Sequence, residues 1–331
     1  MNIDHIIQKS IEVVASHKLE PGVYCRWLWQ DTKNSRRLGI NEYGCADAAN
    51  ILYTVGAFPA DAEEREASVR ALQGLQDETT GLFTEETHHF IHTTAHCAAA
   101  LELFEAKPLY KMHDLKKYTT KDGLYSLLES IDYANNPWDG SHEGAGIYAA
   151  LVLNGEVDLD WQEAYFKWFY EEADPETGFW RKGFVDKGNK PLYYHLAGTF
   201  HYLFNHEYAK MPIRYPEKMI DTCLWLYNNG KMGSDFHQQC DFLAMDFIYC
   251  LNRATRQTPH RMAEAKDVMR DFAKKHLDFL NSLDWKTHDG INDLHRLFGI
   301  LCCLAELQLA LPGEIRSEKP LRLVLDRRPF I

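Results

Sequence analysis

Histidine, tyrosine and carboxylate side chains open a series of helical stretches that recur at intervals of roughly 50 residues. These stretches begin near residues 41, 88, 141, 194, 235 and 292. A neutral imidazole can take a proton near neutral pH, and a tyrosine hydroxyl can return one. If the stretches lie side by side, their polar openings meet at one end, where they can carry out acid–base chemistry.

Aligning the stretches on their leucines places these polar residues in two layers. The layer nearest the helix starts contains Tyr43, His92, His142, Tyr194, Asp241 with Phe242, and His295. About one turn deeper lie Asp47, His96, Gly146, Gly198, Asp246 and Gly299. A glycine inside a helix costs about 1 kcal/mol relative to alanine, so we expect another helix or a ligand to approach these glycines closely.

Two kinds of catalysis fit the polar residues. Histidine and tyrosine favour proton abstraction beside a carbonyl or carboxylate, as in uronate elimination or sugar epimerisation, whereas a carboxylate pair favours glycoside hydrolysis. The candidate catalytic residues are His92, His142, Tyr194, Asp47 and Glu143. The candidate substrate-binding residues are Tyr43, His96, Asp241, Asp246, His295 and Arg296.

Periodicity predicts an all-α protein built from alternating outer and inner helices. Residues 62–72 carry charges on one face and apolar residues on the other, as expected of an outer helix. Residues 91–103 are rich in alanine, which lets neighbouring helices approach closely. No linker rich in Pro, Gly or Ser divides the chain. We therefore predict one domain over residues 1–311, with residues 312–331 as a basic, solvated tail packed on it.

One repeat resembles a known family. Residues 72–83 form a Gln-Asp turn with glycine and an aromatic residue, and residues 92–103 continue as a Thr-Ala-Leu helix. This pattern is similar to the repeat of the prenyltransferase and squalene-cyclase superfamily. The resemblance implies an (α/α)6 toroid, a ring of six helical hairpins. Many glycoside hydrolases, polysaccharide lyases and sugar epimerases use the same fold, so the chemistry must be argued from the site.

A metal site is a further alternative. His88, His92 and His96 are spaced by four residues, so two of them could share a zinc ion on one helical face. Asp47, His142 or Asp241 would then have to supply a third ligand. The resembled protein prenyltransferases bind zinc through Asp, Cys and His, but the order and spacing of Cys240, Asp241 and His295 depart from that pattern. We expect no cofactor, with zinc as the alternative.

Composition restricts the partners of this 331-residue chain. A net charge of −12 argues against nucleic acid, which is bound through clustered Lys and Arg. The sequence contains no stretch of 18 apolar residues, so no membrane span is expected. The first residues lack the features of a secretion signal. The eight cysteines lie in apolar helical patterns and are expected to be reduced core thiols of a cytoplasmic protein. The oligomeric state stays open.

Together these features predict a carbohydrate-active enzyme that binds an oligosaccharide in the centre of the toroid. Two alternatives come from other classes of protein. Isoprenoid or terpene-cyclase-like chemistry would need an aromatic cavity with few polar contacts. A non-catalytic binding scaffold would have its polar layers packed shut, with each histidine hydrogen-bonded inside the wall.

Overall fold

The structure, a computed structural model, describes residues 1–31, 35–233 and 235–331 and is almost entirely helical. The central helices are α2 (Glu42–Thr54), α4 (Phe90–Leu103), α6 (Pro137–Asn154), α8 (Leu192–Ala209), α10 (Leu243–Thr255) and α13 (Leu294–Ala310). The peripheral helices are α1 (Asp4–His17), α3 (Ala62–Gln73), α5 (Lys121–Ser130), α7 (Leu159–Glu172), α9 (Pro216–Asn228) and α11 (Met262–Ser282). The all-α prediction is confirmed.

Short elements join these helices. Strands β1 (Lys18–Glu20) and β2 (Val23–Tyr24) form an antiparallel hairpin after α1. The remaining elements are the 3-10 helices η1 (His113–Tyr118) and η2 (Phe236–Gln238) and the short helices α12 (Asp289–Asn292) and α14 (Val324–Arg327).

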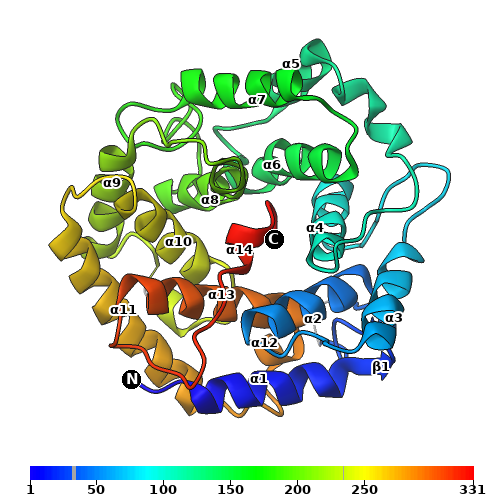
Figure 1. Cartoon of the computed structure of the whole chain (residues 1–331). Coiled ribbons are helices and arrows are strands. Elements are labelled where there is room, and N and C mark those ends of the chain that lie inside the picture. Colours follow the sequence, from blue (N-terminus) through cyan, green and yellow to red (C-terminus); the bar gives the residue numbers. More distant parts are fainter. Residues whose placement is uncertain (32–34, 234) are drawn as a thin grey trace.

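The central helices contact one another in a closed cycle. Helix α2 packs on α4, α4 on α6, α6 on α8, α8 on α10, and α10 on α13, which returns to α2. Figure 1 shows the peripheral helices outside this cycle and the end of the chain in its middle. Each central helix therefore has a neighbour on both sides and can present a third face to the centre.

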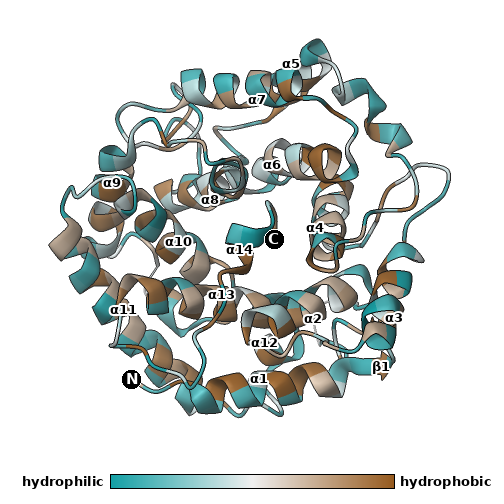
Figure 2. Ribbon diagram, in the orientation of Figure 1, coloured by the Kyte–Doolittle hydropathy of each residue, from teal (hydrophilic) through white to brown (hydrophobic). Residues whose placement is uncertain are grey.

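The central helices are more deeply buried than the peripheral helices. Every residue of α10 is buried, whereas α11 buries only an apolar stripe along one face. Figure 2 shows the peripheral helices striped in hydrophilic and hydrophobic residues, as expected where one face meets water. All eight cysteines are buried and unpaired, as predicted.

Side-chain caps fix where three central helices begin. The side chain of Asn41 accepts hydrogen bonds from the backbone amides of Tyr43 and Gly44 at the start of α2. His89 and Asp293 cap α4 and α13 in the same way. A cap satisfies amide groups that have no partner within the helix, and it sets the position of the residues that follow. The polar residues of the first turns are thereby held at one end of the cycle.

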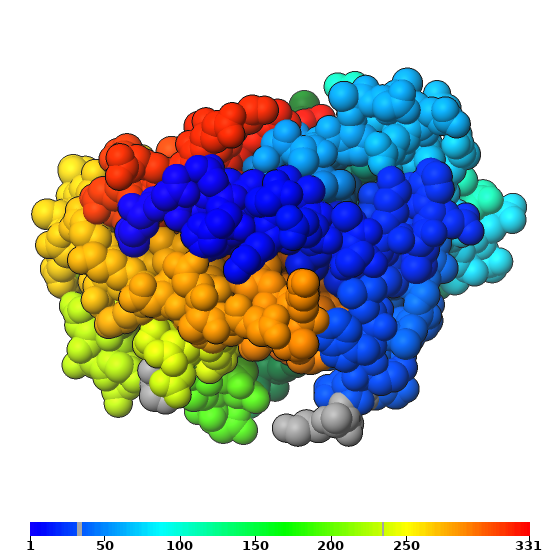
Figure 3. Space-filling model, turned by 90° about the horizontal axis from the view of Figure 1, so that it is seen from below, coloured from blue at the N-terminus to red at the C-terminus, as the bar shows by residue number. Residues whose placement is uncertain are grey.

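The N-terminal segment covers the place where the two ends of the cycle meet. Figure 3 shows α1 lying along α11 on the outer surface. His5 Nε2 lies 2.5 Å from Asn281 Oδ1, and the amide of Ile3 donates to the carbonyl of Arg316 at 2.9 Å. Segments far apart in sequence are therefore joined outside α2 and α13.

The tail packs on the domain through Leu321 and Leu325, and Arg316, Lys319 and Arg322 are exposed, but its last residues enter the middle of the cycle instead of staying in solvent. Arg328 and Phe330 are fully buried, and the Phe330 ring lies 4.8 Å from that of His92. The Arg328 guanidinium lies over the Phe298 ring and donates to the Phe330 carbonyl. Composition marked this segment as basic, but the cation–π contact and the backbone bond let one of its charges be buried.

The three glycines of the deeper layer face protein atoms. A Cβ on Gly198 would lie 2.5 Å from the Pro137 carbonyl oxygen, and one on Gly146 would lie 3.1 Å from that of Ile91. A Cβ on Gly299 would lie 3.0 Å from the Phe242 ring. These glycines therefore serve close packing between central helices.

Gly198 faces a backbone carbonyl, whereas Gly299 faces a side-chain ring, and this difference predicts different effects on stability. Gly198→Ala should lower the free energy of unfolding by about 1–3 kcal/mol, because a backbone carbonyl cannot move aside. Gly299→Ala should be much milder, since the Phe242 ring can turn and alanine favours the helix. Urea unfolding of both variants tests this. Equal stability of the two variants would contradict the packing argument.

Candidate active site

Imidazole rings from four central helices and one connecting segment gather inside the cycle. His92 and His142 have ring centroids 4.4 Å apart, and His142 and His201 are 4.9 Å apart. Tyr43 stacks on His88 at 4.6 Å. The histidine cluster, as we name it, consists of Tyr43, Asp47, His88, His92, His96, His142, His201 and His295.

Asp47 ties together two of these imidazoles. His96 Nε2 donates to Asp47 Oδ1 at 2.9 Å, and His295 Nδ1 donates to Oδ2 at 3.1 Å. A carboxylate only accepts, so both of these nitrogens carry protons. Burial alone would raise the pKa of Asp47, but the two histidines bring it below its ordinary range. Asp47 is thus a buried carboxylate that fixes the tautomer of His295.

His295 lines a cavity at the end of the cycle where the central helices begin. In the neutral form of this ring, the bond from Nδ1 to Asp47 leaves Nε2 as the nitrogen without a proton. This mouth cavity has a volume of about 360 Å³. It is lined by Arg26, Trp27, Asp31, Ser35, Arg36, Thr87, His88, Trp138, Asp241, Phe242, Asp289, Asp293, His295 and Arg296.

Arg26 organises the wall of the mouth cavity. Its Nε and Nη2 donate to the two oxygens of Asp293 at 2.8 and 3.1 Å, and Nη1 donates to Glu85 at 3.1 Å. The guanidinium lies over the rings of Trp27 and Tyr43. Burial would raise the pKa of Asp293, yet Arg26 lowers it to about 2. The buried guanidinium is thus paired with two carboxylates, and Asp293 also caps the helix that carries His295.

Neutral rings link the mouth cavity to the interior. Burial and neighbouring histidines lower the pKa of His88 well below its ordinary value. The Tyr43 hydroxyl lies 2.6 Å from His92 Nδ1, and burial raises the pKa of this tyrosine well above its ordinary value. His88 Nδ1 is 2.6 Å from Thr87 Oγ1. These groups can pass protons while staying uncharged at neutral pH.

Most residues of the two predicted layers do come together. Those that join the histidine cluster are Tyr43, Asp47, His92, His96, His142 and His295. Asp241 and Arg296 line the mouth cavity. Asp241 accepts from the amide of Leu243, and burial raises its pKa.

Three predicted site residues lie elsewhere. Tyr194 packs on Trp138, with ring centroids 5.7 Å apart, and makes no ring contact with the cluster among the described residues. Glu143 is half-buried, 3.8 Å from His89. Asp246 is fully buried, and across the described part of the chain neither of its oxygens has a hydrogen-bond partner. Burial therefore raises its pKa well above the ordinary value, which favours the uncharged carboxyl group.

Residues that the leucine alignment did not select complete the site. His201 lies two turns beyond Tyr194 on α8, so a search for histidine at later positions of each stretch would have found it. His88 lies in the segment just before α4, and its ring stacks on that of His92 with centroids 4.8 Å apart. Arg26 and Trp27 follow β2 in a connecting segment without helical periodicity, and no sequence signal placed them at the mouth.

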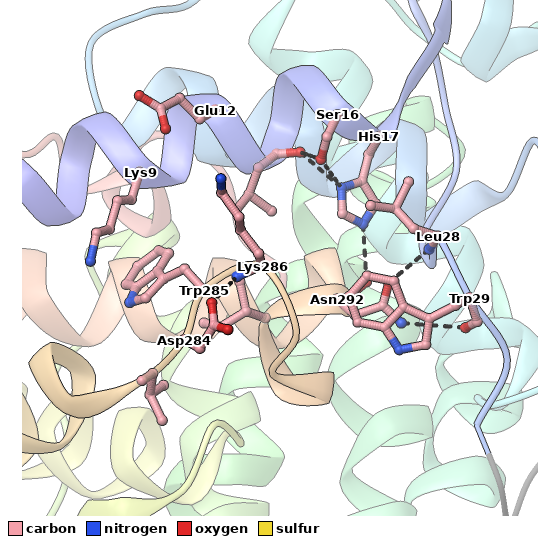
Figure 4. A pocket seen from close by; sticks show the side chains of 13 residues that line it. Lys9, Glu12, Ser16, His17, Leu28, Trp29, Asp284, Trp285, Lys286 and Asn292 are labelled. Atoms are coloured by element: carbon pink, nitrogen blue, oxygen red, sulfur yellow. Dashed lines mark hydrogen bonds between the residues drawn. The ribbon is translucent and has the colours of Figure 1, made fainter.

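A second hollow, of about 450 Å³, lies on the outer surface between α1 and the turn before α12. Figure 4 shows Trp29, Trp285 and His17 lining it. His17 contacts the carbonyl of Val13 with Nδ1 at 2.8 Å and that of Asn292 with Nε2 at 3.0 Å. With both nitrogens engaged by backbone, His17 joins segments together and is not a free base.

Comparison of the chain with protein-family models, curated proteins and solved structures finds no match in any of the three. Function must therefore be inferred from the geometry of the site. None of the helices in the described residues combines the length and apolar character needed to cross a bilayer.

Proposed function

We propose that the chain is an (α/α)6 toroid whose mouth cavity is the active site of a carbohydrate-active enzyme. The closed cycle of central helices with peripheral helices outside it supports the toroid. The observation that carries the enzymatic proposal is the pair of Asp47 and His295. A buried carboxylate orients an imidazole, and the free nitrogen of that imidazole belongs to a residue lining the cavity.

The arrangement favours proton abstraction, and therefore elimination or epimerisation of a sugar acid. His295 acts as the general base, and His88, with its ring 5.2 Å away, is the second acid–base group. Arg296 has a half-exposed side chain at the cavity and is suited to bind a substrate carboxylate. Trp138, which is only partly buried, offers a flat apolar surface for the pyranose ring.

Glycoside hydrolysis is the second candidate, because Asp241 lines the cavity and its burial raises its pKa as a general acid requires. The pair expected from the sequence, Asp47 and Glu143, is not suited to this reaction. Asp47 is engaged by two histidines, and Glu143 lies beside His89 away from the cluster. Isoprenoid chemistry is less favoured, since charged residues line much of the cavity.

The test is a substrate screen with matched variants. Uronate-containing and neutral oligosaccharides are incubated with the protein, and new double bonds, epimers and released reducing ends are measured. His295→Gln and His88→Gln should each lower turnover by about 100-fold or more, the usual contribution of general acid–base catalysis. Glu143→Gln is the control and should retain activity.

The same panel separates the two reactions. Loss of activity in Asp241→Asn, with release of reducing ends and activity retained in His295→Gln, would favour hydrolysis. Full turnover in both histidine variants, with folding unchanged by circular dichroism, would place the active site elsewhere.

A further inference from the structure

Three histidines from three successive central helices converge inside the cluster. His92 comes from α4, His142 from α6 and His201 from α8. One ring nitrogen from each lies within 4.8 Å of the other two. His92 and His201 are buried, and His142 is partly so. Such a spacing lets small side-chain rotations bring three nitrogens onto one ion.

The hydrogen bonds of His201 leave a nitrogen free for this purpose. Its Nδ1 lies 3.1 Å from the carbonyl oxygen of Ala197, which can only accept, so Nδ1 carries the proton. Ser141 Oγ donates to the Trp138 carbonyl and lies 3.1 Å from the same Nδ1, so this oxygen can also accept from the ring. Nε2 is then an unprotonated ligand atom. Metal-binding histidines are typically held in this way, with the other ring nitrogen bonded to a carbonyl.

The rings of His92 and His142 can also each offer a free nitrogen to a metal ion. His92 Nδ1 is 2.6 Å from the Tyr43 hydroxyl oxygen, which can accept a hydrogen bond from it and so leave Nε2 free. His142 makes no hydrogen bond through either nitrogen to any residue that the structure describes. Neutral imidazoles are the form that binds metal.

The neighbouring group of Asp47, His96 and His295 is less suited, although its ligand atoms are also close together. There the histidine nitrogens already donate protons to the carboxylate. An ion would have to break both bonds. The two groups are therefore distinguishable by their hydrogen bonding.

We propose that His92, His142 and His201 bind one divalent transition-metal ion, with Zn²⁺ as the preferred ion. Imidazole ligands suit zinc, copper, iron and nickel, and three of them leave a fourth position for water or substrate. The ion would lie beside His88, whose ring is 5.8 Å from that of His142. Metal binding is independent of the carbohydrate substrate and can be measured without one.

The full-length protein is treated with a chelator, dialysed, and titrated with Zn²⁺ by calorimetry. We expect one ion per chain, and Co²⁺ should give the visible absorption bands of a low-coordinate nitrogen site. His201→Gln and His142→Gln should each weaken zinc binding by about 100-fold or more. Tyr43→Phe should weaken it by roughly 10- to 100-fold, as loss of a group that orients a ligand does.

His206→Gln is the matched control. His206 is another buried histidine of α8, bonded to the Tyr202 carbonyl, and its replacement should leave zinc binding as in the wild type. Circular dichroism confirms folding, and the partly exposed position of His142 provides a variant that tolerates replacement if His201→Gln unfolds. Failure of the wild type to bind zinc or cobalt, or equal binding by wild type and His142→Gln, would overturn the proposal.

Discussion

Asp47→Asn is expected to lower turnover by about 1000-fold or more while leaving substrate binding nearly unchanged. The Asp47 carboxylate accepts from His96 Nε2 and from His295 Nδ1. An amide can accept from only one of these rings, so its NH₂ group faces the other. An NH₂ group that faced His96 would force the proton of that ring onto Nδ1. This is unfavourable, because Nδ1 of His96 is buried without a hydrogen-bond partner among the described residues. The NH₂ group therefore faces His295.

With the amide nitrogen facing His295, Nδ1 of that ring must accept and Nε2 must carry the proton. The ring then presents a proton to the cavity and can no longer act as a base. The loss should appear in kcat, with little change in KM, because Asp47 is fully buried and does not line the cavity. Steady-state kinetics on the substrate found by the screen measure both constants.

Asp246→Asn is the matched control for this variant. Asp246 is equally buried on a central helix, but burial raises its pKa, and its carboxyl has no hydrogen-bond partner among the described residues. An amide of the same shape should therefore replace it with little change in activity or stability. Equal loss of activity in the two variants would show that burial of the aspartate, and not its bond to His295, is what matters.

Lowering the pH from 7 to 5 is expected to destabilise the protein by on the order of 5 kcal/mol through three buried histidines outside the cluster. Burial lowers the pKa values of His195, His206 and His276 to about 4 in each case. The unfolded chain therefore binds protons between about pH 6.5 and 4 where the native chain does not. Their stabilising contribution is complete above about pH 6.5 and is lost as the pH falls toward 4.

Urea unfolding at pH 8, 7, 6 and 5 measures this dependence. Between pH 6 and 5, His276→Gln should lose roughly 1 kcal/mol less unfolding free energy than the wild type. This is close to the free energy expected when unfolding takes up one proton over one pH unit. Glutamine can still donate to the His237 carbonyl, which His276 Nδ1 contacts at 2.9 Å. A variant with the wild-type pH dependence would contradict the assignment. Between pH 8 and 7 the two proteins should behave alike.

Helical periodicity and the alignment of the stretches on their leucines were sufficient to predict the helices and much of the cluster. Local rules govern both, since a cap such as Asn41 fixes the turn that carries Tyr43. The alignment failed for α8 because it assumed that every central helix turns the same face inward. Gly198 and Tyr194 share a face, and that face packs on Pro137 and Trp138 of α6.

Glu143 was misplaced for a simpler reason. Neighbouring residues of a helix point about 100° apart, so a residue beside His142 in sequence does not share its direction. The bond between Arg26 and Asp293 joins residues 267 positions apart, and no local pattern can predict such a pair. The helices are thus predictable from local sequence, whereas the wall of the mouth cavity depends on the assembled cycle.

The closed cycle has a consequence for how the protein folds. Five of its contacts join neighbouring stretches, but α13 must find α2 across most of the chain, as the bond between His295 and Asp47 over 248 positions shows. Closing so long a loop is slow, and until it occurs the apolar flanks of both helices are exposed. At high concentration, α13 of one copy can meet α2 of another first. Domain-swapped oligomers are therefore the by-product that this topology favours when the chain folds in a crowded solution.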